Sequence, residues 1–189
     1  CRGELWLQPL QEGKPLGEPQ RLVEQEGTIS QPVLSPDGNW VAYYLIQHES
    51  KQRDIWIAPI PAGPPVRITD HPAGEMSPSW SPDGKTIAFF SDRDGIESLF
   101  TIPIAGGRAA GPATRITPPG LPAFHPVWSA DGQWIAFSSK RSGNWDLWVT
   151  RVDRGKPRQL TFDTSFDSPC AWSADSQWIY FVTSNEGNS

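Results

Sequence analysis

A single four-residue turn recurs four times in this chain of 189 residues. Each copy reads Ser-Pro/Ala-Asp-Gly/Ser, and successive copies begin 44 to 48 residues apart, at Ser35, Ser81, Ser129 and Ser173. A repeat of this length is typical of one four-stranded blade, so the chain is predicted to be a repeat array. The aspartates are predicted to form turns rather than to act in catalysis, because Pro, Asp and Gly suit the backbone of a tight turn.

The segments around each turn are predicted to be the strands of one blade. A short first strand precedes the turn, and a nearly unbroken apolar run follows it, at 40–44, 86–90, 134–137 and 178–182. A strand that is apolar on both faces must be covered on both, which predicts a second strand sandwiched between neighbouring sheets. Third strands are predicted near 54–57, 98–101 and 146–149, and short polar fourth strands near 67–69, 115–117 and 158–161. Such polar strands suit an outer edge.

Tryptophans recur at matching positions of these strands. They are Trp80, Trp128 and Trp172 in first strands, Trp40, Trp134 and Trp178 in second strands, and Trp6, Trp56 and Trp148 in third strands. Because the positions are periodic rather than clustered, we expect these rings to pack one blade against the next.

The strand pattern predicts an all-β fold, a β-propeller of about four four-stranded blades. The expected divisions are a half blade at 1–26 with third and fourth strands, blades at 27–72, 73–120 and 121–164, and a half blade at 165–189 with first and second strands. Because the two halves are complementary, a closed four-bladed ring and an arc of a six- to eight-bladed propeller both remain open. The only methionine is Met76, so the chain is expected to be a piece or a processed form of something longer.

Composition and motifs favour a protein that is not an enzyme. A net charge of −5 without a basic cluster argues against nucleic acid as a partner, and no run is long enough for direct membrane insertion. No Gly-x-Ser-x-Gly motif occurs, and His48, His71 and His125 are predicted to be loop residues. No metal or cofactor is predicted, because Cys1 and Cys170 lack metal-ligand spacing. Cys170 is predicted to be a small buried side chain.

The chain resembles the TolB-type, WD40-like β-propeller repeat. The resemblance lies in the turns, the Trp-Ser before them, the Ile-Ala-Phe strand, the Asp-Ile/Leu-Trp strand and the Arg-x-Thr segment that ends each repeat. The resemblance covers nearly the whole chain and is cleanest over 77–182; Leu34 in place of Trp and Ser176 in place of Gly depart from it. It implies a bacterial protein with a periplasmic or extracytoplasmic location. Relatives with such blades include periplasmic TolB, sensory domains of bacterial regulators and gating propellers of prolyl-oligopeptidase-like serine peptidases.

Two functions remain open on this resemblance. The first is a non-catalytic scaffold or sensor module that binds a protein or peptide at the channel mouth or a ring face. The alternative is the substrate-gating propeller of a prolyl-oligopeptidase-like serine peptidase whose catalytic domain lies outside this chain. Self-association through open blade ends is a further expected interaction, because unpaired sheet edges invite pairing.

The candidate binding residues precede the prolines that open the first strands. In each repeat the chain returns from the outer strand to the centre just before Pro32, Pro78, Pro126 or Pro169. The preceding residues are therefore predicted to ring one mouth of the channel: Gln31, Ser77, His125 and Ser168, with Asp167 beside the last. They differ between blades, as a binding surface on a rigid scaffold requires. The alternative is that these loops only hold water.

Overall fold

The computed structural model describes residues 2–153 and 155–184, and these residues form strands and turns without a helix. The all-β prediction is therefore confirmed. Cys1 lies outside the described residues.

Three complete antiparallel sheets make up the middle of the molecule. The first contains β5 (Thr28–Leu34), β6 (Trp40–Ile46), β7 (Arg53–Pro59) and β8 (Val66–Arg67). The second contains β9 (Glu75–Trp80), β10 (Thr86–Ser91), β11 (Ser98–Ala105) and β13 (Thr114–Arg115), with β12 (Arg108–Ala109) also paired to β11. The third contains β14 (Phe124–Trp128), β15 (Trp134–Ser139), β16 (Asp146–Arg151) and β17 (Arg158–Gln159). Each has the strand order predicted for a blade.

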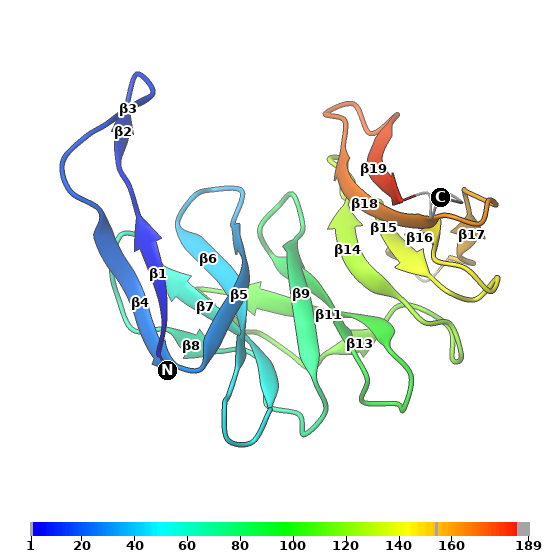
Figure 1. Cartoon of the computed structure of the whole chain (residues 1–189), viewed down its shortest axis with the longest axis horizontal. Coiled ribbons are helices and arrows are strands. Elements are labelled where there is room, and N and C mark those ends of the chain that lie inside the picture. The colour runs from blue at the N-terminus through cyan, green and yellow to red at the C-terminus, as the bar shows by residue number, and fades with distance from the viewer. Residues whose placement is uncertain (1, 154, 185–189) are drawn as a thin grey trace, which may run out of the picture.

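Two separate ribbons flank these sheets. One pairs β1 (Arg2–Leu7) with β4 (Gln20–Glu26), and the other pairs β18 (Phe166–Trp172) with β19 (Ile179–Ser184). The small hairpin of β2 (Leu10–Gln11) and β3 (Lys14–Pro15) was not predicted. In Figure 1 the two ribbons lie at opposite ends of the row of sheets. Since they do not pair with each other, the described residues form an open arc and not a closed four-bladed ring.

The repeated turn is held by the same hydrogen bonds in all four copies. The serine Oγ donates to the aspartate Oδ1 at 2.5–2.6 Å, and the backbone NH five residues after the serine donates to the serine Oγ at 2.9–3.0 Å. The NH two residues after the aspartate donates to Oδ1 at 3.0–3.1 Å. Ser176 adopts φ 58°, close to the 68–72° of Gly38, Gly84 and Gly132. The turn aspartates are thus structural, and Ser176 keeps the left-handed backbone of the glycine it replaces.

Tryptophans of the first strands join neighbouring sheets. Trp80, Trp128 and Trp172 each donate an indole hydrogen bond to a carbonyl oxygen in the first strand of the preceding sheet. Trp80 and Trp128 are buried, and Trp148 of a third strand is buried in the same core cluster as Trp128. The predicted packing between blades is correct for these rings.

The prediction was wrong for tryptophans and strands in the end ribbons. Trp6 and Trp178 are exposed, and β19 exposes most of its side chains rather than being covered on both faces. The physical reason is position, since these residues belong to ribbons with a described sheet on one side only. Leu34, at a position where other repeats have Trp, is likewise exposed.

Candidate functional site

The residues before the strand-opening prolines lie at backbone irregularities. The pairings of β5, β9 and β14 with the next strand each shift at this point, so that two residues oppose one in a β-bulge. Gln31, Ser77 and His125 have φ of 48°, 53° and 50°. A positive φ is uncommon for residues other than glycine, and its repetition at one position of three repeats shows that the fold imposes it.

The fourth repeat departs from this pattern. In β18 the shift falls between Pro169 and Ala171, so the additional residue, Cys170, lies at the bulge. Cys170 is exposed, which corrects the prediction of a buried side chain. The bulge explains the exposure, because the inserted residue is displaced from the regular alternation of the strand.

Four of the five candidate residues meet in one depression. Its volume is about 440 Å³, and it is lined by Gln31, Ser77, His125 and Ser168 together with the four prolines, Val33 and Val127. The depression therefore draws on the first strands of four successive sheets. Its lining combines uncharged hydrogen-bonding groups with apolar surface, a composition typical of binding sites for uncharged segments.

Side chains from neighbouring sheets contact each other within the depression. Ser77 Oγ donates to Gln31 Oε1 at 2.6 Å, and Ser168 Oγ lies 3.3 Å from His125 Nδ1. Both contacts join residues more than forty positions apart in sequence, so they hold adjacent first strands in register. Each of these groups retains further hydrogen-bonding capacity for a ligand.

His125 is half-buried and lies in β14, not in a loop as predicted. The bulge sets it among the prolines of the inner strands rather than on a connecting segment. Burial lowers the pKa of its imidazole below the usual 6.5, so the ring is neutral at pH 7. A neutral ring both donates and accepts hydrogen bonds, which suits an uncharged ligand.

Asp167 does not line the depression. Its side chain is fully buried, and both carboxylate oxygens are without a hydrogen-bond partner among the described residues. Its backbone NH donates to the Trp145 carbonyl at 2.7 Å, and its carbonyl accepts from Ser138 Oγ at 2.9 Å. The backbone of Asp167 therefore holds β18 against the preceding sheet. This contact lies one residue before Ser168.

Other buried carboxylates lie inside the sheets. Asp54 pairs with Arg67 at 2.8 Å, and Glu75 pairs with Arg93. Burial raises the pKa of both carboxyl groups, and the arginines oppose that rise. No sequence signal marks their burial, because acidic residues also occur in exposed loops. The first ion pair links β7 to β8, and the second links β9 to the turn after β10, so both carboxylates have a structural role.

A row of aromatic rings was also missed. Phe90, Phe124, Trp145 and Phe166 follow one another with centroid separations of 4.8, 4.7 and 6.1 Å. The row runs from β10 through β14 to β18 and so crosses two sheet boundaries. Trp145 lies outside the tryptophan periodicity of the strands, and no sequence signal marked it.

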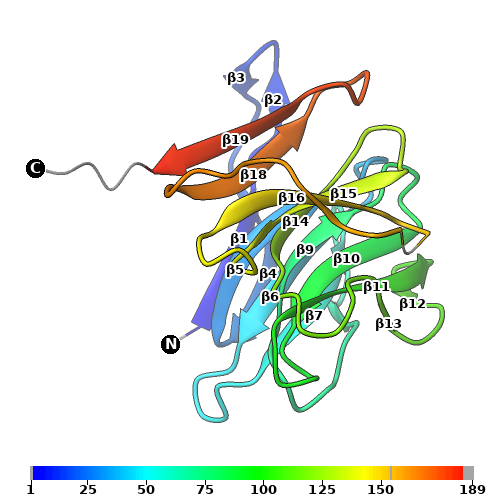
Figure 2. The same cartoon turned by 90° about the vertical axis from the view of Figure 1, so that its right-hand side faces the viewer.

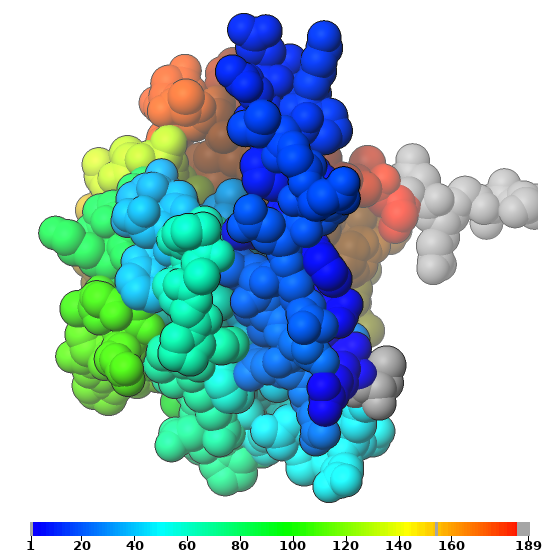
Figure 3. Space-filling view, turned by 90° about the vertical axis from the view of Figure 1, so that its left-hand side faces the viewer, coloured from blue at the N-terminus to red at the C-terminus, as the bar shows by residue number. Residues whose placement is uncertain are grey.

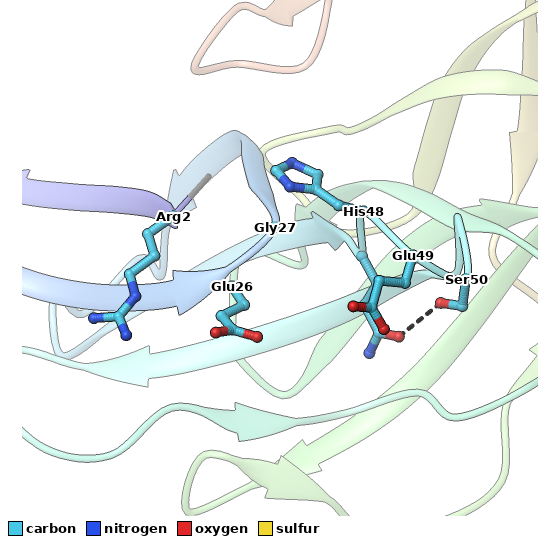
Figure 4. A pocket seen from close by; sticks show the side chains of 7 residues that line it. Arg2, Glu26, Gly27, His48, Glu49 and Ser50 are labelled. Atoms are coloured by element: carbon cyan, nitrogen blue, oxygen red, sulfur yellow. Dashed lines mark hydrogen bonds between the residues drawn. The ribbon is translucent and has the colours of Figure 1, made fainter.

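A second depression of about 520 Å³ lies near the amino-terminal ribbon (Figure 4). It is lined by Arg2, Glu26, Gly27, Gln47, His48, Glu49 and Ser50. His48 Nε2 lies 3.0 Å from Thr28 Oγ1, and in Figure 4 the His48 ring and the Glu49 carboxylate point in different directions. Because these groups do not converge on one point, the depression offers no assembled acid–base site.

Within residues 2–153 and 155–184, no group of three or more His, Cys, Asp or Glu side chains is arranged to hold a metal ion. Among the same residues, no helix is long and apolar enough to cross a membrane.

The chain was compared with known protein families. Residues 2–121 match the TolB beta propeller domain. This chain belongs to that family. The resemblance inferred from its turns and strands is thus confirmed, and the sheets described above are blades of a TolB-type propeller. No curated protein matches the chain.

Solved structures with the same fold include two TolB proteins. TolB from Agrobacterium tumefaciens is 28% identical with a TM-score of 0.75, over 96% of this chain and 63% of that protein. TolB from Acinetobacter baumannii is 25% identical with a TM-score of 0.74, over 90% of this chain and 41% of that protein. The chain therefore spans less than two thirds of the length of either TolB.

A puromycin-hydrolysing peptidase from Mycobacterium tuberculosis also shares the fold. It is 15% identical with a TM-score of 0.64, over 78% of this chain and 25% of that protein. At this identity the likeness shows the fold alone.

Proposed function

We propose that this chain is a non-catalytic module that binds an extended protein segment or peptide at the depression before the strand-opening prolines. The observation that carries the proposal is the convergence of Gln31, Ser77, His125 and Ser168 in that depression. These residues differ between repeats, whereas the turn and its hydrogen bonds repeat. Variation at one position of a rigid scaffold supports a recognition role.

The chemistry of the depression favours a peptide. Amide, hydroxyl and imidazole groups can pair with the NH and C=O groups of an extended backbone, while Val33 and Val127 offer apolar contact. The positive φ of three of these residues supports the same interpretation, because residues with a strained backbone tend to cluster at functional sites. We infer a periplasmic or extracytoplasmic location in a bacterium from membership of the TolB family.

The alternative, a gating propeller of a serine peptidase, has weaker support. Peptidases share the fold at 12–20% identity, whereas the two TolB proteins share it at 25–28%. Without an assembled nucleophile and base in the described residues, we expect this chain to hydrolyse neither peptides nor glycosides.

The experiment is a selection of phage-displayed random linear peptides on the immobilised chain. Selected peptides are then titrated against the wild type and against Gln31→Ala combined with His125→Ala. The double variant is expected to bind roughly tenfold or more weakly, because it removes two groups from the site. The matched control, Lys85→Ala with Gln177→Ala, changes two exposed turn residues at the other end of the first strands and should bind normally. Equal affinity for all three proteins contradicts the proposed site.

A further inference from the structure

Two acidic side chains are buried at the boundary between the first and second complete sheets. Asp54 of β7 and Glu75 of β9 have no exposed surface. Each is paired with an arginine, since Arg67 lies 2.8 Å from Asp54 and Arg93 pairs with Glu75. In Figure 3 these two sheets lie next to each other at the amino-terminal end of the molecule. Two buried negative charges are therefore balanced by two positive charges at this boundary.

The same two positions are acidic at the boundary between the third sheet and the β18–β19 ribbon. Asp146 stands two residues before the tryptophan that pairs with the fourth strand, as Asp54 does. Asp167 pairs with the residue four positions after the isoleucine that faces the first-strand tryptophan, as Glu75 does. Asp146 and Asp167 have no exposed surface. Figure 2 shows β18 beside β16 at this end of the molecule.

Uncharged residues occupy both positions at the boundary between the second and third sheets. The third-strand residue there is Ser98. The first-strand residue is Ala123, whose NH donates to the carbonyl before Ser98 at 3.0 Å. In the same way the NH of Asp167 donates to the carbonyl before Asp146 at 2.7 Å. Because this boundary forms without acidic residues, the fold itself does not require an acidic pair at these positions.

The arginines of the first boundary are replaced at the third. Gln159 of β17 stands at the position of Arg67, because both pair with the third-strand tryptophan. Arg93 lies two residues beyond the pairing partner of its buried acid, and the residue at that position of the last repeat is Asn185, outside the described residues. The third boundary therefore carries two buried negative charges with no ion pair among the described residues.

The two carboxylates at the third boundary also lack hydrogen bonds. Neither carboxylate oxygen of Asp167 has a partner among the described residues. Asp146 Oδ2 accepts hydrogen bonds from Ser142 and Gln159, whereas its Oδ1 is buried without a partner. Since Asp167 has no exposed surface, its missing partner does not result from an open sheet edge. Buried carboxylates are strongly unfavourable unless a cation or hydrogen bonds compensate the lost water.

The chemistry of these oxygens selects a hard divalent cation. Two carboxylates supply two negative charges and only oxygen atoms, which suits Ca²⁺ rather than a metal that prefers nitrogen or sulfur. Ca²⁺ also gives up its water more readily than Mg²⁺, as a buried position requires. Because no third acidic or imidazole side chain joins the pair among the described residues, neutral oxygens of the backbone or of water complete the shell.

We propose that Asp146 and Asp167 bind one Ca²⁺ ion at the boundary between the third sheet and β18. The ion supplies the positive charge that Arg67 and Arg93 supply at the first boundary. Because Asp146 belongs to β16 and Asp167 to β18, the bound ion also holds β18 against the third sheet.

Isothermal titration calorimetry on the full chain, freed of metal with a chelator, tests binding. The wild type is expected to bind one Ca²⁺ ion per chain. Asp167→Asn keeps the shape of the side chain but removes one ligand charge, so it should weaken Ca²⁺ binding roughly tenfold or more. The matched control, Asp153→Asn, removes an exposed carboxylate just after β16 and should bind like the wild type.

Urea unfolding with and without Ca²⁺ gives an independent measurement. Ca²⁺ should raise the unfolding midpoint of the wild type, because it binds the folded chain, and should leave that of Asp167→Asn unchanged. Gln159→Arg restores the arginine of the first boundary. It should raise the midpoint of the metal-free chain and weaken Ca²⁺ binding roughly tenfold or more, because the guanidinium pairs with Asp146.

The Gln159→Arg variant decides the question even if Asp167→Asn fails to fold. The proposal is overturned if the folded wild type binds no Ca²⁺ or if folded Asp167→Asn binds Ca²⁺ as tightly as the wild type. It is also overturned if Gln159→Arg neither stabilises the metal-free chain nor weakens Ca²⁺ binding.

Discussion

The indole Nε1 of Trp128 donates a 3.1 Å hydrogen bond to the carbonyl oxygen of Ser79 in the first strand of the preceding blade. Equivalent bonds join Trp80 to Val33 and Trp172 to Val127. Trp80 and Trp128 are buried and Trp172 is half-buried, so each of these three rings makes a polar contact with the preceding sheet and packs beside it. This repeated contact between a tryptophan and the preceding first strand fixes the spacing of the first strands. It therefore also fixes the geometry of the depression at their prolines.

Loss of this tryptophan contact between blades should destabilise the fold. Trp128→Ala is expected to lower the free energy of unfolding by about 3–5 kcal/mol, because it removes a buried aromatic side chain and leaves a cavity. Trp128→Phe should cost less, since the ring stays and only the hydrogen bond and part of the indole are lost. Urea unfolding measures both, with Phe162→Ala at an exposed position as control. If Trp128→Ala lowers the free energy of unfolding by less than about 1 kcal/mol, Trp128 does not stabilise the contact between the two blades.

Ser176 offers a test of the turn. Its left-handed backbone favours glycine, but Ser176 Oγ also accepts a 3.0 Å hydrogen bond from the Asp131 backbone NH of the neighbouring turn. Ser176→Gly should therefore leave stability within about 0.5 kcal/mol of wild type, because relief of strain offsets the lost bond. Ser176→Ala should cost about 1 kcal/mol, because it loses the bond and keeps the strain. Equal stability of the two variants in urea melts would refute this balance.

The turn aspartates should add an acid dependence to stability. The hydrogen bond from Ser81, followed by the one from the Lys85 backbone, lowers the pKa of Asp83 below its usual 3.8. Asp83 therefore stabilises the fold above the unfolded pKa, and that stabilisation is lost as the pH falls through the folded pKa. Asp83→Asn should be less stable than wild type at neutral pH, and the difference should shrink below about pH 4. Urea melts at both pH values measure the difference, with Gln11→Asn, which changes no titratable group at an exposed position, as the control.

His125 should add a second dependence near neutral pH. Burial lowers its pKa, so the folded chain binds a proton less readily than the unfolded chain. Stability should be level above the unfolded pKa of about 6.5 and fall as the pH drops towards the folded value. His125→Gln should lack this decrease when urea melts at about pH 7 and about pH 5 are compared. An imidazole that titrates at or above 6.5 by NMR would contradict the burial argument.

The features of this structure that could be predicted from sequence are those that depend on neighbouring residues in the chain. The turn, the strands and the buried first-strand tryptophans repeat in sequence, so their positions could be read directly. The exposure of Trp6 and Trp178 could not, because it depends on which blade faces each ribbon. The burial of Asp167 follows from the bulge at Cys170, which shifts the proline of β18 relative to the other first strands. The aromatic row through Trp145 depends on contacts between three sheets and carries no periodic signal.

The most direct test of the proposed binding site is photo-cross-linking of a selected peptide that carries a benzophenone group. Cross-linked residues are mapped by mass spectrometry on the wild-type chain. The account predicts attachment within β5, β9, β14 and β18, around the strand-opening prolines, and loss of labelling in the variant Gln31→Ala with His125→Ala. Attachment confined to the Ser-Pro-Asp-Gly turns or to the outer strands would contradict it.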